Sequence, residues 1–333
     1  MKILIRLPNW LGDIIMSTAF INAVIEAYPG SQIDVIIKKG LKDVLTHCDG
    51  INHVYEFSKT DFSGLSGAAR FGKKISQRAT YDFFFCLPNS FSSAWMGFFT
   101  KSKNRIGYKN ELRSFLFTHS SPIQKGLHRV EDYAFLLSHF SKTPSSSLAV
   151  SLRQKNNKNT LLPQGKNLLL NINSEAQSRR MPIDLATKIV RTVKTKHDFN
   201  FILTGSKKDI PYTTQLEENF KSENIVYNFT GKTTLSELFE LVSQVDYIIT
   251  TDSGIAHLGN AFKIPTIVLF GAGNEENTKP YNSKDLKIIR KTGLDCAPCV
   301  SNTCQFGTPK CLIELEVMEI LLALDTLINQ KDN

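Results

Sequence analysis

Tyr247–Leu258, which reads YIITTDSGIAHL, is the stretch that decides the fold. Its mostly apolar beginning, residues 247–250, is typical of a short buried strand in a parallel sheet. Asp252 and Ser253 then stand where helix N-caps belong, and residues 254–262 can form a helix. Such a unit points a helix N-terminus out of the carboxyl edge of a sheet, where doubly wound α/β folds bind their ligands.

The predicted helix start at Gly254 is a candidate anion site. Free N–H groups and the positive end of the helix dipole favour an anion there, and phosphate is the usual occupant. His257 lies one turn into this helix and can add a donor to the same anion. The alternative is that Asp-Ser-Gly only caps the helix and that His257 is an ordinary packed residue.

The rest of the chain alternates strands and helices in two series, which predicts two parallel sheets covered on both faces. Residues 141–166 separate the two series and are rich in Ser, Pro and Asn, a composition that is typical of a connection between domains. We therefore expect an N-terminal domain over residues 1–150 and a C-terminal domain over residues 166–312. A terminal helix is expected in residues 313–333.

The bulk composition is that of a globular protein with an anionic partner. The chain has 333 residues, 41% hydrophobic and 21% charged, and a net charge of +9. That charge favours nucleic acid, an acidic membrane surface or a phosphorylated substrate. Nucleic acid ranks last because no basic motif interleaved with aromatic residues is present. With no convincing secretory signal and no apolar run of about 20 residues, we expect a cytoplasmic protein that touches a membrane only from the inside.

Two common nucleotide-binding motifs are missing from the sequence. No GxGxxG follows the first predicted strand, and neither GxxxxGKS nor GxxxxGKT occurs anywhere. The sequence therefore argues against a standard dinucleotide-binding fold and against a P-loop NTPase.

The loop after the first strand carries a candidate catalytic carboxylate. Gly12 lets the backbone approach a ligand closely. Asp13, at the carboxyl end of the strand and in a cleft between two domains, is placed to take a proton from an incoming hydroxyl group. The alternative is that Asp13 caps a helix starting at Ile14, and the two roles are compatible.

The loop after the first strand of the second series contains Asn173, Ser174, Arg179 and Arg180. Adjacent arginines can be a solvated pair, but guanidinium groups also bind phosphate bidentately. Together with the helix N-terminus at Ser253, they would surround a negatively charged leaving group. Such electrostatic stabilisation needs no metal.

Four cysteines are clustered near the C-terminus with the spacing C-x2-C-x4-C-x6-C, at Cys296, Cys299, Cys304 and Cys311. Four thiolates on short loops can close a tetrahedral zinc site. The spacing differs from the common paired CxxC arrangement, so reduced, packed thiols are the alternative. Stable disulfides are disfavoured in a reducing cytosol.

As a set, these motifs resemble the ADP-heptose:lipopolysaccharide heptosyltransferases of glycosyltransferase family 9. The resemblance covers nearly the whole chain. It rests on RLPNWLGD at residues 6–13, GKT with a following LSEL at residues 231–238, DSGIAH at residues 252–257, and FG at 270–271 followed by PY at 280–281. The opening PNWLGD, His128 ahead of the Glu-Asp-Tyr helix, and the cysteine cluster are most similar to the type II heptosyltransferases.

The resemblance implies a GT-B fold, in which two Rossmann-like doubly wound domains face each other. The N-terminal domain would bind the acceptor and the C-terminal domain the nucleotide-sugar donor, with the last helix packing back on the first domain. It further implies inverting transfer of L-glycero-D-manno-heptose from ADP-heptose to the heptose/Kdo inner core of lipopolysaccharide. The enzyme would need no cofactor and would act peripherally at the cytoplasmic face of the inner membrane.

The resemblance also implies roles for individual residues. Asp13 would be the general base and Asp252 would contact the donor heptose. The diphosphate would be held by Ser253, Gly254, Ile255 and His257, with Ser174, Arg179 and Arg180 near the phosphates and Asp209 near the adenosine ribose. The acceptor side would include Asn9, Trp10, Gly12 and His128.

Two departures from the family pattern bear on the choice of donor. The family commonly has Lys-Arg-Trp-Pro where this chain has Arg-Arg-Met-Pro at residues 179–182, and Asp209 is one methylene shorter than the usual glutamate. The alternatives are therefore a GT-B enzyme that uses another nucleotide sugar, such as another transferase or an epimerase, and a non-catalytic nucleotide- or zinc-binding module.

Overall fold

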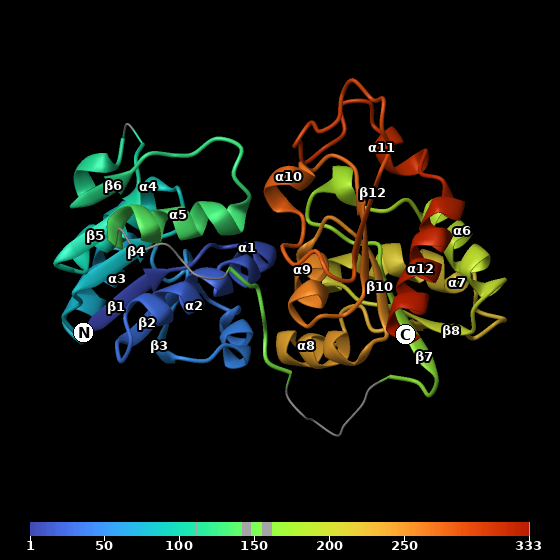
Figure 1. The fold of residues 1–333 in the computed structure, drawn as a ribbon, viewed down its shortest axis with the longest axis horizontal. Coiled ribbons are helices and arrows are strands. Elements are labelled where there is room, and N and C mark those ends of the chain that lie inside the picture. The colour runs from blue at the N-terminus through green and yellow to red at the C-terminus, as the bar shows by residue number, and fades with distance from the viewer. Residues whose placement is uncertain (111, 142–147, 155–161, 333) are drawn as a thin grey trace. The chain divides into compact units, whose positions relative to one another are not determined.

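The computed structural model describes residues 1–110, 112–141, 148–154 and 162–332. Contacts divide the chain into two compact units, Met1–Leu152 and Arg153–Asn333 (Figure 1). Each unit contains one six-stranded sheet, and every strand pair in both sheets is parallel. The predicted α/β class with two doubly wound parallel sheets is confirmed.

The sheet of the first unit has the strand order β3-β2-β1-β4-β5-β6. Its strands are β1 Lys2–Arg6, β2 Gln32–Lys38, β3 Ile51–Phe57, β4 Phe83–Cys86, β5 Asn104–Tyr108 and β6 His119–Ser121. Its helices are α1 Leu11–Met16, α2 Thr18–Ala27, α3 Gly64–Ser76, α4 Phe91–Phe99 and α5 Arg129–Ser141, with 3-10 turns at Lys42–His47 and Ser114–Leu116. α1, α2 and α5 pack together, and α3 packs on α4.

The strand β4 shows why a strand covered on both faces is a continuous apolar run. Alternate side chains of FFFC point to opposite faces of the sheet. Phe84 packs into the cluster that contains Phe71 of α3 and Met96 of α4, while Phe85 stacks edge-on against Phe20 of α2. The two helix groups therefore cover the two faces of the first sheet.

The sheet of the second unit has the order β12-β11-β10-β7-β8-β9. Its strands are β7 Lys166–Asn171, β8 Phe199–Leu203, β9 Val226–Asn228, β10 Tyr247–Thr251, β11 Thr266–Phe270 and β12 Leu286–Arg290. Its helices are α6 Ile183–Lys194, α7 Ile210–Glu218, α8 Leu235–Gln244, α9 Gly254–Ala261, α10 Glu275–Thr278, α11 Lys310–Ile313 and α12 Val317–Asp332. Short 3-10 turns lie at Gln177–Arg179 and Lys207–Asp209.

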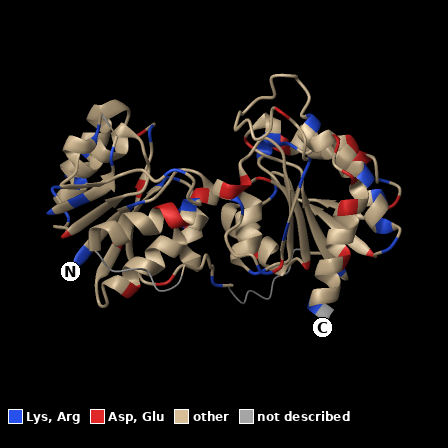
Figure 2. Cartoon of the chain, turned by 45° about the horizontal axis from the view of Figure 1, so that its top comes forward, with Lys and Arg blue, Asp and Glu red and all other residues tan. Residues whose placement is uncertain are grey.

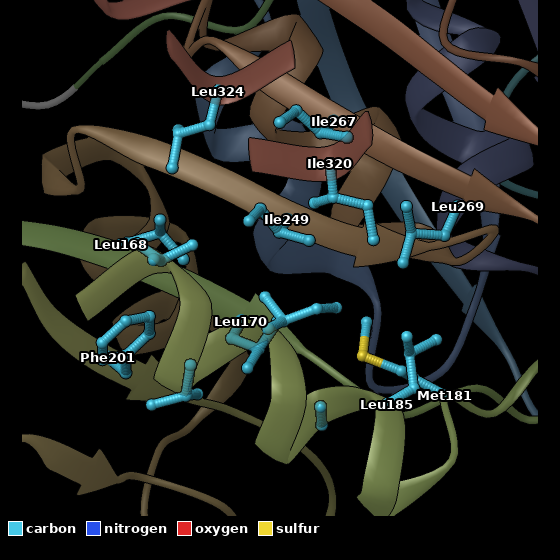
Figure 3. Packing of buried hydrophobic residues seen from close by; sticks show 14 of the residues in the cluster. Leu168, Leu170, Met181, Leu185, Phe201, Ile249, Ile267, Leu269, Ile320 and Leu324 are labelled. Atoms are coloured by element: carbon cyan, nitrogen blue, oxygen red, sulfur yellow. The ribbon is translucent and has the colours of Figure 1, made fainter. Parts of the chain in front are cut away.

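The C-terminal helix α12 completes the core of the second unit. It contacts α6, β11 and β12. Its side chains Ile320 and Leu324 pack against the sheet residues Ile267 and Leu269 (Figure 3). The helix therefore belongs structurally to the second unit, and its expected packing on the first domain stays a prediction.

Both strand orders reverse direction at one point, between β1 and β4 in the first sheet and between β7 and β10 in the second. Connections from these two central strands diverge, and ligands of doubly wound folds bind at the carboxyl end of such a switch point. The sequence places the candidate residues after the strands β1, β7 and β10. Among the residues described, no helix is both long enough and apolar enough to cross a bilayer.

Some local predictions were wrong. The apolar periodicity of residues 14–28 predicts one helix, but the structure has two, because the hydroxyl groups of Ser17 and Thr18 donate to the carbonyls of Ile14 and Ile15 and compete with the helical ladder. The sequence also allows one strand at residues 148–152 in the connection between the domains, and the structure has none there. The strand β6 and the helix α7 were not predicted.

Candidate active site

The helix α9 starts directly after β10 at the switch point of the second sheet. Ser253 is its N-cap residue, but the Ser253 side chain makes no capping hydrogen bond. By contrast, Thr234 caps α8 in a capping box with Glu237, as the sequence predicted. The Ser253 hydroxyl group therefore leaves the first turn of α9 uncapped, although the N–H of Ala256 donates to the carbonyl of Ser253 at 3.1 Å, and the positive dipole end that favours an anion is present.

Asn171, the last residue of β7, holds the Ser253 side chain away from the cap position. Its Nδ2 lies 3.0 Å from Oγ of Ser253 and 3.0 Å from Oγ1 of Thr250. The same nitrogen lies 3.0 Å from the carbonyl oxygen of Asn173. This amide ties the loop after β7 to the loop after β10, so the switch point is held in one conformation.

The start of α9, where the sequence predicts an anion site, is only partly open to solvent. Ser253 and Gly254 are half-buried, whereas Ile255 and His257 are buried. A ligand at this helix end would therefore meet the backbone of the first turn before it meets the imidazole of His257. The ligand roles predicted for these four residues remain predictions.

Arg179 and Asp252 form a buried ion pair at the same edge of the sheet. Nη1 of Arg179 lies 2.9 Å from Oδ2 of Asp252, whose side chain is 5% exposed. Gly273, in the loop after β11, passes close to this carboxylate. A Cβ atom at residue 273 would lie 2.1 Å from Oδ2 of Asp252. The loop can therefore pass the ion pair because residue 273 has no side chain.

Arg180 forms a second ion pair, with the carboxylate of Asp209. Its Nη2 donates to Oδ1 of Asp209 at 2.8 Å, and its Nε donates to the carbonyl of Ser174 at 3.0 Å. The other oxygen of Asp209 accepts from the backbone N–H and the hydroxyl group of Ser206, at 2.9 and 2.7 Å. Arg180 thus links the loops after β7 and β8. The role of Asp209 at a ribose stays a prediction, and its carboxylate is already bound within the protein.

Asp13 lies in the first turn of α1, at the switch point of the first sheet. The N-cap of α1 is Trp10, so the alternative that Asp13 caps a helix starting at Ile14 is wrong. Nε of Arg129 lies 3.9 Å from Oδ1 of Asp13, and Nη1 of Arg129 lies 3.5 Å from Oδ2 of Asp132. One arginine therefore lies between two carboxylates.

The two carboxylates differ in their access to solvent. The side chain of Asp13 is 26% exposed, whereas that of Asp132 is 11% exposed. Burial raises the pKa of Asp132, against the opposing effects of Tyr108 and Arg129. Asp13 is therefore the more accessible of the two carboxylates, and it also lies within the first turn of a helix, where negative charge is favoured.

His128 fixes the start of α5 and so the position of Arg129. Its Nδ1 accepts from the backbone N–H of Val130, and the backbone N–H of His128 donates to Oε2 of Glu131, both at 3.2 Å. This reciprocal pattern resembles a capping box, with the side chain of His128 accepting from the second helical residue instead of the third. His128 is buried. Its predicted place on the acceptor side stays a prediction, and what the structure shows is a positioning contact.

The other predicted acceptor-side residues lie in the loop between β1 and α1. Trp10 is 62% exposed, and Nζ of Lys38 lies 5.7 Å from the centroid of its indole ring. Asn9 accepts a hydrogen bond from Arg6 at 2.5 Å. Gly12 lies in the first turn of α1, next to Asp13. The loop therefore presents an aromatic side chain to solvent beside the candidate base.

Two buried arginines were not among the predicted site residues. Arg6 and Arg113 each donate to the asparagine of a Leu-Pro-Asn segment, residues 7–9 after β1 and residues 87–89 after β4. Both side chains are almost fully buried. Burial lowers the pKa of Arg6 to about 10, which leaves it charged at neutral pH. The repeated tripeptide on the two sides of the switch point is the sequence signal that identifies them.

The four clustered cysteines line one cavity of about 190 Å³ in the second unit. All four thiols are free, and the pKa of Cys311 is raised by burial and by the other three sulfurs. Backbone bonds join this loop to Ser178 and to Ala272, so it lies beside the loops after β7 and β11. Within the described parts of the chain, no three His, Cys, Asp or Glu side chains are grouped to hold a metal ion. Zinc here stays a prediction.

Comparison with known proteins gives one family. Residues 68–309 match the family model "Glycosyltransferase family 9 (heptosyltransferase)". The chain is 25% identical to lipooligosaccharide heptosyltransferase 2 of Campylobacter jejuni serotype O:6 over 326 residues, or 96% of this chain and 97% of that protein. It is 25% identical to lipopolysaccharide heptosyltransferase 2 of Salmonella typhimurium over an alignment of 354 positions, gaps included, which covers 99% of this chain and 99% of that protein.

Solved structures share the fold over the full length. The structure of E. coli ADP-heptose LPS heptosyltransferase II matches with a TM-score of 0.85 and 23% identity, covering 100% of both chains. A family 9 glycosyltransferase of Veillonella parvula matches with a TM-score of 0.85 and 19% identity, covering 99% of this chain and 97% of the other. At these identities the likeness concerns the fold alone.

Proposed function

Because this chain belongs to glycosyltransferase family 9, the heptosyltransferase family, we propose that it transfers L-glycero-D-manno-heptose from ADP-heptose to the heptose/Kdo inner core of lipopolysaccharide. The names of its full-length relatives in Campylobacter jejuni and Salmonella typhimurium support the acceptor class. The single observation that carries the proposal is the uncapped first turn of α9 at the switch point, next to the Arg179–Asp252 pair.

The proposed chemistry is an inverting displacement. The acceptor hydroxyl oxygen forms a bond to C1 of the donor sugar while the bond from C1 to the diphosphate oxygen breaks. The hydroxyl proton goes to Asp13, and ADP leaves with the bonding electron pair. Negative charge develops on the diphosphate, and the first turn of α9 supplies N–H donors and a positive dipole end to stabilise it.

The Arg179–Asp252 pair solves an electrostatic conflict in this proposal. A lone buried carboxylate beside the diphosphate site would repel the donor. The guanidinium group of Arg179, 2.9 Å from Oδ2 of Asp252, offsets that charge. Asp252 can then accept hydrogen bonds from the hydroxyl groups of the donor sugar. Ser174 and Arg180 complete the donor side, with Asp209 held by Arg180.

We assign the acceptor to the first unit and the donor to the second. The inner core is carried by a lipid, so the enzyme would work as a peripheral protein at the cytoplasmic face of the inner membrane, with no nucleic acid partner and no required cofactor. The net charge of +9 suits an acceptor and a membrane surface that are both acidic. Family membership does not favour the alternatives, which are another nucleotide sugar and a non-catalytic module.

Donor binding tests the proposal directly. We expect titration calorimetry to show ADP and ADP-heptose binding at least about tenfold more tightly than UDP-glucose or GDP-mannose, because a donor site must select its nucleotide. Transfer is then measured by mass spectrometry with a deacylated, water-soluble inner-core oligosaccharide as acceptor. Preference for UDP or GDP sugars would refute the choice of donor, and donor binding without transfer would favour the non-catalytic alternative.

Gly273→Ala should weaken ADP-heptose binding by about tenfold, the effect of misplacing one buried charged contact. The added Cβ would lie 2.1 Å from Oδ2 of Asp252, so either the carboxylate or the loop must move. Gly271→Ala is the matched control in the same loop, since its Cβ would meet Sγ of Cys311 at 3.0 Å and not the ion pair. Calorimetry on both variants checks the prediction, which fails if both bind donor equally well.

A further inference from the structure

One face of the first unit exposes large apolar side chains. We call it the α3–α4 face and define it by Leu65 of α3, Phe98 of α4, and Leu112 and Phe115 in the segment that contains the 3-10 turn Ser114–Leu116. Their exposed fractions are 48%, 42%, 74% and 71%. α4 contacts both α3 and the 3-10 turn, so the four residues come from three adjoining elements.

The sequence of α4, FSSAWMGFF, divides its aromatic residues from its small ones. On the side toward the sheet, a Cβ at Gly97 would lie 2.0 Å from the ring of Phe84, so the helix backbone lies close on the strand. On the other side the rings of Phe91, Trp95 and Phe98 stack in sequence, with centroids 6.0 and 6.2 Å apart. We call these three rings the aromatic ladder of α4; Phe91 and Trp95 are half-buried and pack against the core, and Phe98 is the exposed end of the ladder.

Contacts join this ladder to its neighbours. Nε1 of Trp95 donates to the carbonyl of Leu65 at 3.1 Å, which fixes the start of α3 beside the ladder. The guanidinium group of Arg105 lies 5.3 Å from the ring centroid of Phe98, and Nζ of Lys73 lies 5.3 Å from that of Phe99. Cations therefore stand directly over the aromatic rings.

The part of the chain that forms this face carries much of the net charge. Residues 64–118 contain nine Lys or Arg and two Asp or Glu, which is a net charge of +7 (9 − 2) out of the +9 of the whole chain. Arg70, Lys73 and Lys74 of α3 are all exposed. Figure 2 marks the Lys and Arg residues of the first unit on its ribbon. Exposed cations on an element that also exposes large apolar side chains match a partner surface that is both negatively charged and apolar.

We propose that the α3–α4 face docks the protein on an acidic lipid bilayer. Aromatic and leucine side chains enter the boundary between headgroups and acyl chains, and Lys and Arg residues bind the anionic headgroups. The long Lys and Arg stems let the charged ends stay at headgroup level while the apolar side chains insert. The inference rests on the proposed function, because a lipid-borne acceptor brings the enzyme to such a surface.

Vesicle co-sedimentation of the full-length protein tests the docking face. We expect binding to phosphatidylglycerol/phosphatidylethanolamine vesicles and much weaker binding to phosphatidylcholine vesicles. Replacing Leu112 and Phe115 by serine should lower the partition coefficient on acidic vesicles by about tenfold or more, since two large apolar side chains would no longer be buried. Both residues are more than 70% exposed, so the fold should tolerate the change.

The matched control replaces Phe306 and Leu322 of the second unit by serine, side chains that are 62% and 61% exposed. This control should bind acidic vesicles like the wild type. A charge variant, Arg70→Glu with Lys73→Glu and Lys74→Glu, should also lose binding to acidic vesicles. The proposal would be overturned if the Leu112/Phe115 variant and the Phe306/Leu322 control lost vesicle binding equally, or if neither lost it. It would also be overturned if the wild-type protein did not bind acidic vesicles.

Failure of the docking proposal can be told from failure of the proposed function. Turnover on the deacylated, water-soluble acceptor does not require a bilayer. The Leu112/Phe115 variant should therefore keep wild-type turnover on that acceptor and lose turnover only on the vesicle-borne one. A protein that binds vesicles through this face without transferring heptose to either acceptor would refute the function and leave the docking face intact.

Discussion

Asp13→Asn should lower kcat by about 10²- to 10⁴-fold, the range that a positioned general base contributes. The amide has the shape of the carboxylate but cannot take the proton of the acceptor hydroxyl at neutral pH. The dissociation constant for ADP should stay within about twofold of wild type, because Asp13 belongs to the acceptor side in the proposed assignment. Rapid-quench turnover and calorimetry on the same preparation measure both quantities.

Asp132→Asn is the matched control for this variant. Asp132 contacts the same arginine, Arg129, but its side chain is buried and Asp13 is the more exposed of the two. A catalytic base must be reached by substrate, so the control should retain most of its turnover. If the two variants lose turnover equally, the Arg129 cluster acts as a structural unit and the assignment of Asp13 as the base is wrong.

The sequence predicted the strand, turn and helix at α9 correctly because their signals are local. An apolar run ending in Asp-Ser-Gly specifies a buried strand, a turn and a helix without help from distant residues. What it could not show is that the side chain of Ser253, the N-cap residue, makes no capping hydrogen bond. That depends on Asn171, which reaches Ser253 only because β7 and β10 are neighbours in the sheet. The open first turn is therefore a product of topology.

The sequence could not predict which charged side chains form ion pairs, because these contacts also depend on topology. Arg179 and Asp252 were both expected at the donor site, but as separate ligands. The structure pairs them across 73 positions of sequence, at 2.9 Å. The sequence identifies Arg6 only as the first residue of the RLPNWLGD motif. Its burial depends on how the strands and helices pack around it. Solvent exposure of a charged side chain is set by tertiary packing, which local patterns do not encode.

The Arg179–Asp252 pair gives the second large effect. Arg179→Gln should lower the free energy of unfolding of the second unit by about 3–5 kcal/mol, because it removes the cation that lies 2.9 Å from a carboxylate that is only 5% exposed. Asp252→Asn leaves the more exposed guanidinium group of Arg179, which water can reach, so its loss should be smaller. The double variant should be more stable than Arg179→Gln alone, since it does not bury the charge of Asp252 without the guanidinium group beside it.

Calorimetric unfolding of all four proteins closes this double-mutant cycle. Both tryptophans of the chain, Trp10 and Trp95, lie in the first unit, so tryptophan fluorescence follows that unit alone. The transition seen by calorimetry and not by fluorescence belongs to the second unit, where the pair lies. An unchanged fluorescence transition serves as the internal control. If the losses from Arg179→Gln and Asp252→Asn simply add in the double variant, the two charges do not stabilise each other. In that case Arg179 would be available to bind the donor diphosphate directly, and its replacement would weaken ADP binding.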